Sequence, residues 1–165
     1  MAGSSWGGWL STTQLSGTSL DNLLLDVTGA QNAASEVDYA CLFVVNNTAS
    51  GNPMLNPVLW LPSSADVPGG TTVSVALDPT AASVKGATVQ QAVKITAQTS
   101  APAGVSGWVS NTGTQPTTPS YTNGLQLGTI PAGSCRAVWV RRTAANTTPV
   151  NADGFGLEVD FDTGA

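Results

Sequence analysis

The chain contains no histidine, and only 9% of its residues are charged. Histidine is the commonest general base and a common metal ligand, so its absence excludes Ser-His-Asp and Cys-His catalysis. A chain of this composition favours packing and binding over chemistry. We therefore expect a protein that is not an enzyme and has no catalytic residue.

Positive charge is also scarce. Five Lys and Arg residues stand against ten Asp and Glu residues, which gives a net charge of -5. Binding to nucleic acid of any sequence needs clustered cations, so this balance argues against a nucleic-acid partner. Thr, Ser, Gly, Asn and Pro fill most polar positions, and such a surface offers little charge repulsion to a covering partner. The composition favours an assembly component, with a lightly charged soluble monomer as the alternative.

Long hydrophobic runs are missing. No segment approaches the ~20 apolar residues of a membrane span, so no membrane partner is expected. Residues 1–9 lack the basic and apolar regions of a secretory signal, which predicts a protein made and used from the cytosol. Cys41 and Cys135 both fall in predicted strands, where we expect buried free thiols in a reducing compartment. A disulfide stays open if their two strands are neighbours.

Strand-like alternation is the pattern that the chain does have. In its last element Phe155, Leu157, Val159 and Phe161 alternate with glycines and acidic residues, which is the period of a half-buried strand. Similar short segments recur between turn residues, with no amphipathic helix among them. The pattern predicts an all-β fold, an antiparallel β-sandwich or jelly roll. The predicted strands are residues 23–27, 37–45, 57–62, 71–77, 89–97, 107–109, 125–127, 135–142 and 155–161.

Several segments carry more specific predictions. Residues 37–45 are apolar at both sets of alternating positions, which predicts a central strand covered on both faces. Prolines bracket residues 57–62, which suits a sheet edge or a strand end. Residues 29–35 are expected to form a loop, residues 81–85 fit a single helical turn, and residues 110–123 are the longest predicted loop.

Residues 1–19 are predicted to form an extended N-terminal arm ahead of a single domain of residues 20–165. The arm is rich in Gly, Ser and Thr and has almost no strand pattern. It nevertheless contains Trp6 and Trp9, and exposed indoles are unfavourable in a flexible tail. We therefore expect the arm to dock on its own domain or on a neighbouring subunit, with Trp6 and Trp9 as candidate partner-binding residues.

Acidic residues offer an alternative route to catalysis. Glycoside hydrolysis needs only two carboxylates, and the chain has Glu36, Glu158 and eight aspartates. Asp66 and Asp78 stand beside prolines, however, and Asp153 precedes a glycine. Most of these acids are therefore interpreted as turn-forming or solvent-facing.

A calcium site is conceivable around Asn151, Asp153, Asp160 and Asp162, because calcium takes clustered oxygen ligands. Their spacing matches no EF-hand loop, since the glycine after Asp153 comes too early. We therefore predict no metal site and no cofactor.

The arginines are concentrated in one predicted strand. Arg136 and Arg142 share one face of it, and Arg141 lies on the opposite face at the strand end. Arginine is enriched at interfaces, so all three are candidate partner-binding residues that would meet an acidic surface. The alternative is that they pair with neighbouring acids, where each surface pair contributes little.

Three stretches give the chain a family resemblance. They are Asp38-Tyr-Ala-Cys-Leu-Phe-Val-Val-Asn-Asn-Thr-Ala, Asn56-Pro-Val-Leu-Trp-Leu-Pro and Ile130-Pro-Ala-Gly-Ser-Cys-Arg-Ala-Val-Trp-Val-Arg-Arg. They resemble segments of small β-rich virion proteins of tailed bacteriophages, and the chain is most similar to capsid decoration, or cement, proteins. The resemblance implies a location on the capsid surface of the virion and the major capsid protein as partner. It also implies a homo-oligomer, a trimer on the particle, because such proteins commonly occupy local symmetry axes.

Three other roles remain open. Tail, baseplate and head-fibre proteins of phages share this sequence texture. A glycan-binding adhesin module would need exposed aromatic residues, for which Trp60, Trp108 and Tyr121 are the candidates. A carboxylate-pair hydrolase would need two acids that face each other in a pocket.

Overall fold

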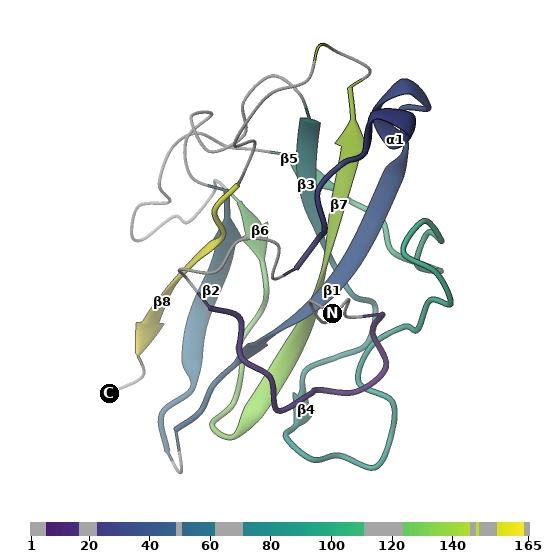
Figure 1. Ribbon diagram of the computed structural model, residues 1–165. Coiled ribbons are helices and arrows are strands. Elements are labelled where there is room, and N and C mark those ends of the chain that lie inside the picture. The colour runs from purple at the N-terminus through teal and green to yellow at the C-terminus, as the bar shows by residue number, and fades with distance from the viewer. Residues whose placement is uncertain are drawn as a thin grey trace.

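The chain folds as a β-sandwich, as the alternation predicts. The computed structural model describes residues 6–16, 23–48, 51–61, 71–110, 124–145, 148 and 155–163. Their strands form two antiparallel sheets (Figure 1). The larger sheet has the order β1 (Val37–Val45), β7 (Ser134–Ala144), β3 (Thr71–Leu77) and β5 (Val109–Ser110), with β4 (Ser83–Val84) also paired to β7. The smaller sheet has the order β6 (Leu125–Gln126), β2 (Met54–Trp60) and β8 (Glu158–Thr163).

The main hydrophobic core lies between the two sheets. Val138 and Val140 of β7 and Val73 and Val75 of β3 face Leu59 of the smaller sheet across it. Alternate residues of each strand enter this core, as the two-residue period of a strand requires. The other buried members are Leu23, Leu24, Ala40, Val44, Leu61, Leu125, Leu127 and Ile130.

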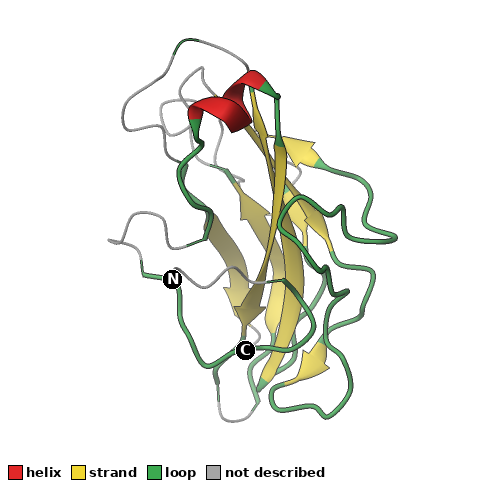
Figure 2. Ribbon diagram, turned by 45° about the vertical axis from the view of Figure 1, so that its right-hand side comes forward, coloured by secondary structure: helices red, strands yellow, loops and turns green. Residues whose placement is uncertain are grey.

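A second hydrophobic cluster lies on the opposite face of the larger sheet. It contains Cys41 of β1, Ala137 and Trp139 of β7, and Ala92 and Ile95 from the connection between β4 and β5. Figure 2 shows that long loops lie beside the strands on one side of the molecule. Both faces of the larger sheet are therefore covered, which explains why β1 and β7 are apolar at both sets of alternating positions.

β1 occupies the predicted residues and is covered on both faces, but it is not central. It pairs with β7, in register from Val37 opposite Thr143 to Val45 opposite Cys135. Among the described strands β7 is the central one, with β1 and β3 on its two sides. The prediction of a central position is therefore wrong. β1 is apolar at both sets of alternating positions because loop residues cover its outer face, and not because it has a second neighbouring strand.

β2 also occupies a different position in its sheet from the predicted one. It lies between β6 and β8, so the prediction of a sheet edge is wrong. Pro57 stands at a register shift between Leu55 and Val58, and Asn56 beside it has a positive φ of 49°. Such a β-bulge interrupts the hydrogen-bond ladder and so accommodates a residue without an N–H inside a sheet.

Residues 23–35 contain a short helix at residues 29–33 and no strand, where a strand and then a loop are predicted. Leu23 and Leu24 are buried in the main core without forming a strand. They lead into α1 (Gly29–Ala33), whose N-cap is Thr28. The Thr28 side chain accepts from the Gln31 N–H, and the Gln31 side chain accepts from the Thr28 N–H. This capping box gives the short helix its start.

The connection between β4 and β5 replaces two further predictions. Residues 83–84 form β4, so residues 81–85 are not a helical turn. Residues 89–97 form no strand and contribute only an isolated bridge between Lys94 and Gly7. The predicted strand fails because its backbone groups bond to the N-terminal segment instead of to a sheet.

The last strand is shifted along the chain. β8 begins at Glu158, while Phe155 and Leu157 are partly buried and pack on the main core ahead of it. Of the predicted long loop, residues 111–123 lie outside the described residues. No helix in the described part of the chain is long and apolar enough to cross a membrane.

Candidate functional site

The N-terminal segment of residues 6–10 docks on the outer layer of the larger sheet. The Ile95 N–H donates to the Trp6 carbonyl at 2.9 Å. The Gln91 and Ala92 N–H groups both donate to the Gly8 carbonyl, at 2.7 and 3.0 Å. The arm therefore contacts its own chain, and it does so through main-chain groups at residues 91–95. We call the surface formed by residues 91–95 and Trp139 the arm slot.

Gly7 fits the arm slot because it has no side chain. Its φ is +77°, and a Cβ atom built on it would lie 1.9 Å from the Val93 carbonyl oxygen and 3.0 Å from the Trp139 ring. The first distance is far inside van der Waals contact, and the obstacle is backbone. Only glycine meets both the conformation and the close approach at this position.

Gln91 connects the arm slot to the larger sheet. Its side-chain amide is buried and donates to the Ser83 hydroxyl, the Val84 carbonyl and the Cys135 sulfur. Its amide oxygen accepts from the Leu10 N–H at 3.0 Å. One buried side chain thus ties the arm, β4 and β7 together, and every polar group of that amide has a partner.

Asp78 supports the arm slot from beneath. One carboxylate oxygen accepts from the Trp139 indole at 2.7 Å and from the Val93 N–H at 2.9 Å, and the other accepts from the Thr80 N–H at 2.8 Å. The side chain is 0% exposed. Its position after β3 is the predicted turn context, but Asp78 does not face solvent.

Trp6 and Trp9 project from the docked segment and remain 41% and 51% exposed. Main-chain bonds hold the segment that carries them, and both residues keep a large exposed surface. Lys94, which is exposed, forms an isolated β-bridge with Gly7, a residue that lies between Trp6 and Trp9 in the sequence. The two predicted partner-binding tryptophans are therefore exposed on a segment that main-chain bonds hold, and Lys94 lies opposite that segment in the bridge to Gly7.

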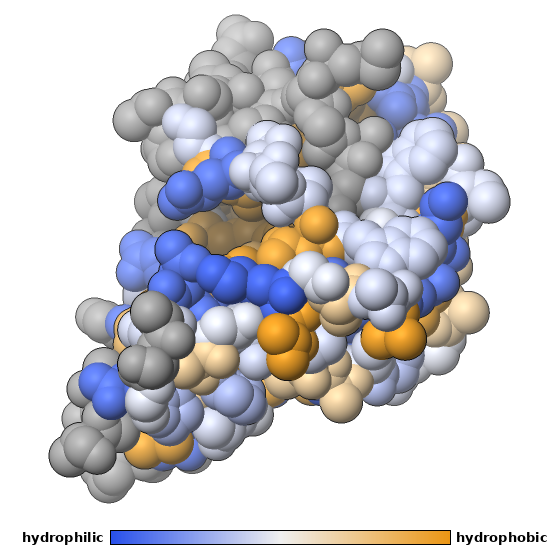
Figure 3. All heavy atoms as spheres, turned by 90° about the horizontal axis from the view of Figure 1, so that it is seen from below, coloured by the Kyte–Doolittle hydropathy of each residue, from blue (hydrophilic) through white to orange (hydrophobic). Residues whose placement is uncertain are grey.

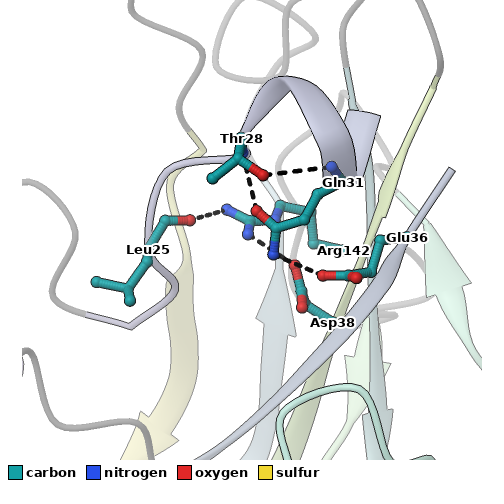
Figure 4. Close-up of polar contacts among 6 residues, drawn as sticks. All are labelled: Leu25, Thr28, Gln31, Glu36, Asp38 and Arg142. Carbon is teal, nitrogen blue, oxygen red and sulfur yellow. Dashed lines mark hydrogen bonds and ion pairs between the residues drawn. The ribbon is translucent and has the colours of Figure 1, made fainter. Parts of the chain in front are cut away.

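The three predicted partner-binding arginines have different environments. Arg142 is 8% exposed, and it donates to Asp38 at 2.8 Å and to the Leu25 carbonyl at 2.6 Å (Figure 4). Its guanidinium joins β1, β7 and the segment before α1, so Arg142 serves the fold and offers little to a partner.

Arg136 and Arg141 are half-buried. Arg136 donates to the Thr80 carbonyl at 2.5 Å, and burial lowers the pKa of its guanidinium while Asp78 raises it. Arg141 lies over the Trp108 ring at 4.6 Å from the centroid, and its Nε donates to the Ser74 hydroxyl. Arg141 is thus on the side of the larger sheet that carries the arm.

The two cysteines are free and buried. Their strands are neighbours, but Cys41 lies opposite Trp139 and Cys135 lies opposite Val45, so the thiols are out of register. Burial raises the pKa of both thiols, and Asp78 adds to the rise at Cys41. Both are buried free thiols, as predicted; Cys41 packs in the second hydrophobic cluster, whereas the Cys135 sulfur accepts from the Gln91 amide.

Of the aromatic residues proposed for sugar stacking, the two in the described part of the chain are buried or covered by other side chains. Trp60 is buried in β2. Trp108 packs against Tyr39 with ring centroids 5.9 Å apart and is covered by Arg141. Tyr121 lies outside the described residues.

The acidic candidates of the described residues do not line the one pocket that is described there. A surface depression of about 380 Å³ opens between the β1–β2 turn and Phe161, and none of its lining residues is an acid. Glu36 accepts from the Gln31 amide. In the described part of the chain no three His, Cys, Asp or Glu side chains are grouped as metal ligands would be. Asn151, Asp153 and Asp66 lie outside it.

The end of the sandwich that carries β4 and the β1–β2 turn has a mixed surface. Viewed from that end, hydrophobic side chains occur in small groups beside hydrophilic ones (Figure 3). Exposed large hydrophobic residues of the whole described surface include Trp6, Trp9, Leu15, Leu25, Val84, Val89 and Phe161.

Comparison of the chain with models of known protein families, with curated proteins and with solved structures found no match. The features described here therefore rest on the chain's own residues.

Proposed function

We propose that the protein is a non-enzymatic structural component of a virion, a decoration protein that binds the outside of a tailed-phage head. The observation that carries this proposal is the exposed pair Trp6 and Trp9, held on the sandwich by main-chain bonds of residues 6–10. The resemblance of the stretches beginning at Asp38, Asn56 and Ile130 to virion proteins supplies the class of partner, the major capsid protein.

Fixed tryptophans suit an interface. Tryptophan is among the residues that contribute most to binding when a partner covers it. An anchor that is already held in place loses little conformational entropy on binding. Trp6 and Trp9 meet both conditions, and Lys94, which bridges to Gly7, would favour an acidic capsid surface.

The proposed mechanism is stabilisation by linkage. A protein that binds the assembled lattice but not free capsid subunits shifts the equilibrium toward the lattice by its binding free energy. It needs no catalytic group and no cofactor. Many copies, each contributing a modest binding energy, would raise the resistance of a filled head to opening.

Two finer assignments belong to the same proposal. A homotrimer on the particle follows from the local symmetry axes that decoration proteins occupy. A jelly roll is supported by the alternation of β1, β2, β3, β6, β7 and β8 between the larger and the smaller sheet.

Co-sedimentation with phage components tests the partner. Purified chain is incubated with DNA-filled heads that lack it, with isolated tails and with unassembled capsid protein from the source phage. We expect saturable binding to heads, and none to tails or to free capsid protein. Binding to tails alone would support a tail or baseplate role, and binding to host-cell glycans alone would support an adhesin; either result would overturn the proposal.

A further inference from the structure

The arm slot holds residues 6–10 largely through main-chain groups. Three hydrogen bonds run between main-chain groups of residues 91–95 and the carbonyls of Trp6 and Gly8. A fourth joins the Leu10 N–H to the Gln91 side chain. The indoles of Trp6 and Trp9 stay half exposed. Specificity therefore comes from the main-chain conformation of residues 6–10, with positive φ at Gly7 and Gly8, and from the absence of a side chain at Gly7.

The slot needs an occupant. Ala92 and Trp139 are fully buried and Gln91 is almost so, and the arm covers this region. Without the arm, the N–H groups of Gln91, Ala92 and Ile95 would lose their acceptors. Any second segment with the same sequence would satisfy these groups equally well.

The tether of the arm is long, because twelve residues lie between Leu10 and Leu23 in the sequence. Residues 11–15 are exposed, and the hydrogen bond recorded for them in the described structure is local, from the Thr13 N–H to the Ser11 hydroxyl. The chain from Leu10 to the buried Leu23 can extend over about 40 Å. This reach exceeds the thickness of a two-sheet sandwich, whose sheets pack about 10 Å apart.

We infer that the arm slot is a subunit-joining site, which accepts residues 6–10 of a second copy of this chain in exchange for its own. The exchanged and the self-docked states make the same bonds, so they differ chiefly in chain entropy. A tether of this length holds the arm near its own slot at an effective concentration of roughly millimolar. Self-docking therefore dominates in dilute solution, and exchange becomes favourable where copies are crowded together.

This inference goes beyond the proposed function and does not need it. It concerns contact between copies of the chain, and its test contains no capsid. A failure of exchange would leave binding to heads intact, and a failure of head binding would leave exchange intact.

The test uses the full chain with Gly7→Ala, whose own arm cannot seat because the new Cβ would meet the Val93 carbonyl. The probe is a fluorescein-labelled synthetic peptide of residues 1–16, followed by anisotropy, with hydrogen exchange at the Gln91, Ala92 and Ile95 amides as a second readout. Full chain with Gly29→Ala is the matched control, because a Cβ at Gly29 meets nothing within 4 Å.

We expect the peptide to bind the Gly7→Ala chain saturably and to restore protection of the three amides. Binding to wild-type or Gly29→Ala chain, whose slots are filled, should be at least tenfold weaker. A peptide that itself carries Gly7→Ala should not bind. Absence of binding at millimolar peptide to a Gly7→Ala chain that melts cooperatively would overturn the inference.

A second measurement decides the question if the Gly7→Ala chain does not fold. Isotope-labelled and unlabelled wild-type chains are mixed at millimolar concentration, and isotope-filtered NOEs are recorded between Gly7 or Gly8 protons and the Gln91 and Ala92 amides. NOEs between labelled and unlabelled copies would support exchange. NOEs confined within single copies would contradict it.

Discussion

The indole N–H of Trp139 donates to the carboxylate of Asp78 at 2.7 Å, and both side chains are completely buried. Trp139 lies in the central strand of the larger sheet, and Asp78 follows directly after β3. The same carboxylate oxygen accepts from the Val93 N–H, which places the arm slot over the Trp139 ring. A carboxylate-pair hydrolase would need acids such as Asp78 to face a pocket. Both carboxylate oxygens of Asp78 instead accept hydrogen bonds that support the arm slot.

Replacing Asp78 should destabilise the fold substantially. Asp78→Ala leaves three donors without their acceptor, which is expected to cost about 3 kcal/mol or more of unfolding free energy. Asp78→Asn keeps one acceptor oxygen and should cost less. Asp26→Ala is the control, because Asp26 is exposed and the change should stay within about 0.5 kcal/mol. Urea unfolding measures all three, and equal effects of Asp78→Ala and Asp26→Ala would contradict this role.

Arg142 and Arg141 should differ sharply although they are adjacent. Arg142→Met leaves Asp38 charged and buried without its partner, which is expected to cost about 3–5 kcal/mol. Arg141→Met removes a half-exposed cation–π contact and should cost about 0.5–1 kcal/mol. The double variant Asp38→Leu/Arg142→Met should lose less than the sum of its single changes. Thermal and urea unfolding of these three variants and of the single variant Asp38→Leu test this. Similar losses for Arg141→Met and Arg142→Met would contradict it.

The buried thiols should make stability fall at high pH. Burial, with Asp78 as a smaller contribution, raises the pKa of the Cys41 thiol above its ordinary value of 9.0, so the folded state keeps a proton that the unfolded chain loses. This thiol's contribution is therefore fully present below pH 9.0 and is lost above it, by about 1.4 kcal/mol per pH unit. Urea unfolding of wild type and Cys41→Ala at pH 8 and pH 10 checks this, and parallel pH dependences would refute it.

Trp6 and Trp9 should matter for binding more than for folding. Because main-chain bonds hold the arm, Trp6→Ala/Trp9→Ala is expected to change the unfolding free energy by about 1 kcal/mol or less. Its affinity for heads should fall at least tenfold, since two anchoring indoles are removed. Leu25→Ala is the matched control, an exposed apolar residue in the segment before α1. Binding isotherms on depleted heads are the measurement, and unchanged affinity of the double variant would exclude these residues from the interface.

Local pattern was enough to predict part of the fold. The two-residue period of Val73, Val75 and Leu77, and that of residues 135–142, is the period of a β-strand, and β3 and β7 are present there. The alternation also predicted that Arg141 and Arg142 lie on opposite faces of their strand. The Thr28-x-x-Gln31 capping box was a readable helix signal that the prediction of a loop at residues 29–35 overlooked.

The arm slot could not be predicted in this way. Residues 89–97 alternate like a strand, but their backbone partners are Trp6 and Gly8, more than eighty positions earlier in the chain. Gln91 and Asp78 are polar residues whose burial depends on those distant partners, so no local period marks them. The glycine at position 7 signals a close approach without identifying what approaches it.

Thermal release of DNA from heads tests the central claim, that this chain stabilises an assembled capsid, most directly. Complete particles, particles that lack the protein, and depleted particles with purified wild-type chain added back are heated, and the temperature of DNA release is recorded. We predict that depleted heads have normal geometry but release DNA at a lower temperature, and that the wild-type chain restores the higher temperature while Trp6→Ala/Trp9→Ala does not. Depleted heads that release DNA at the same temperature as complete ones would contradict the account.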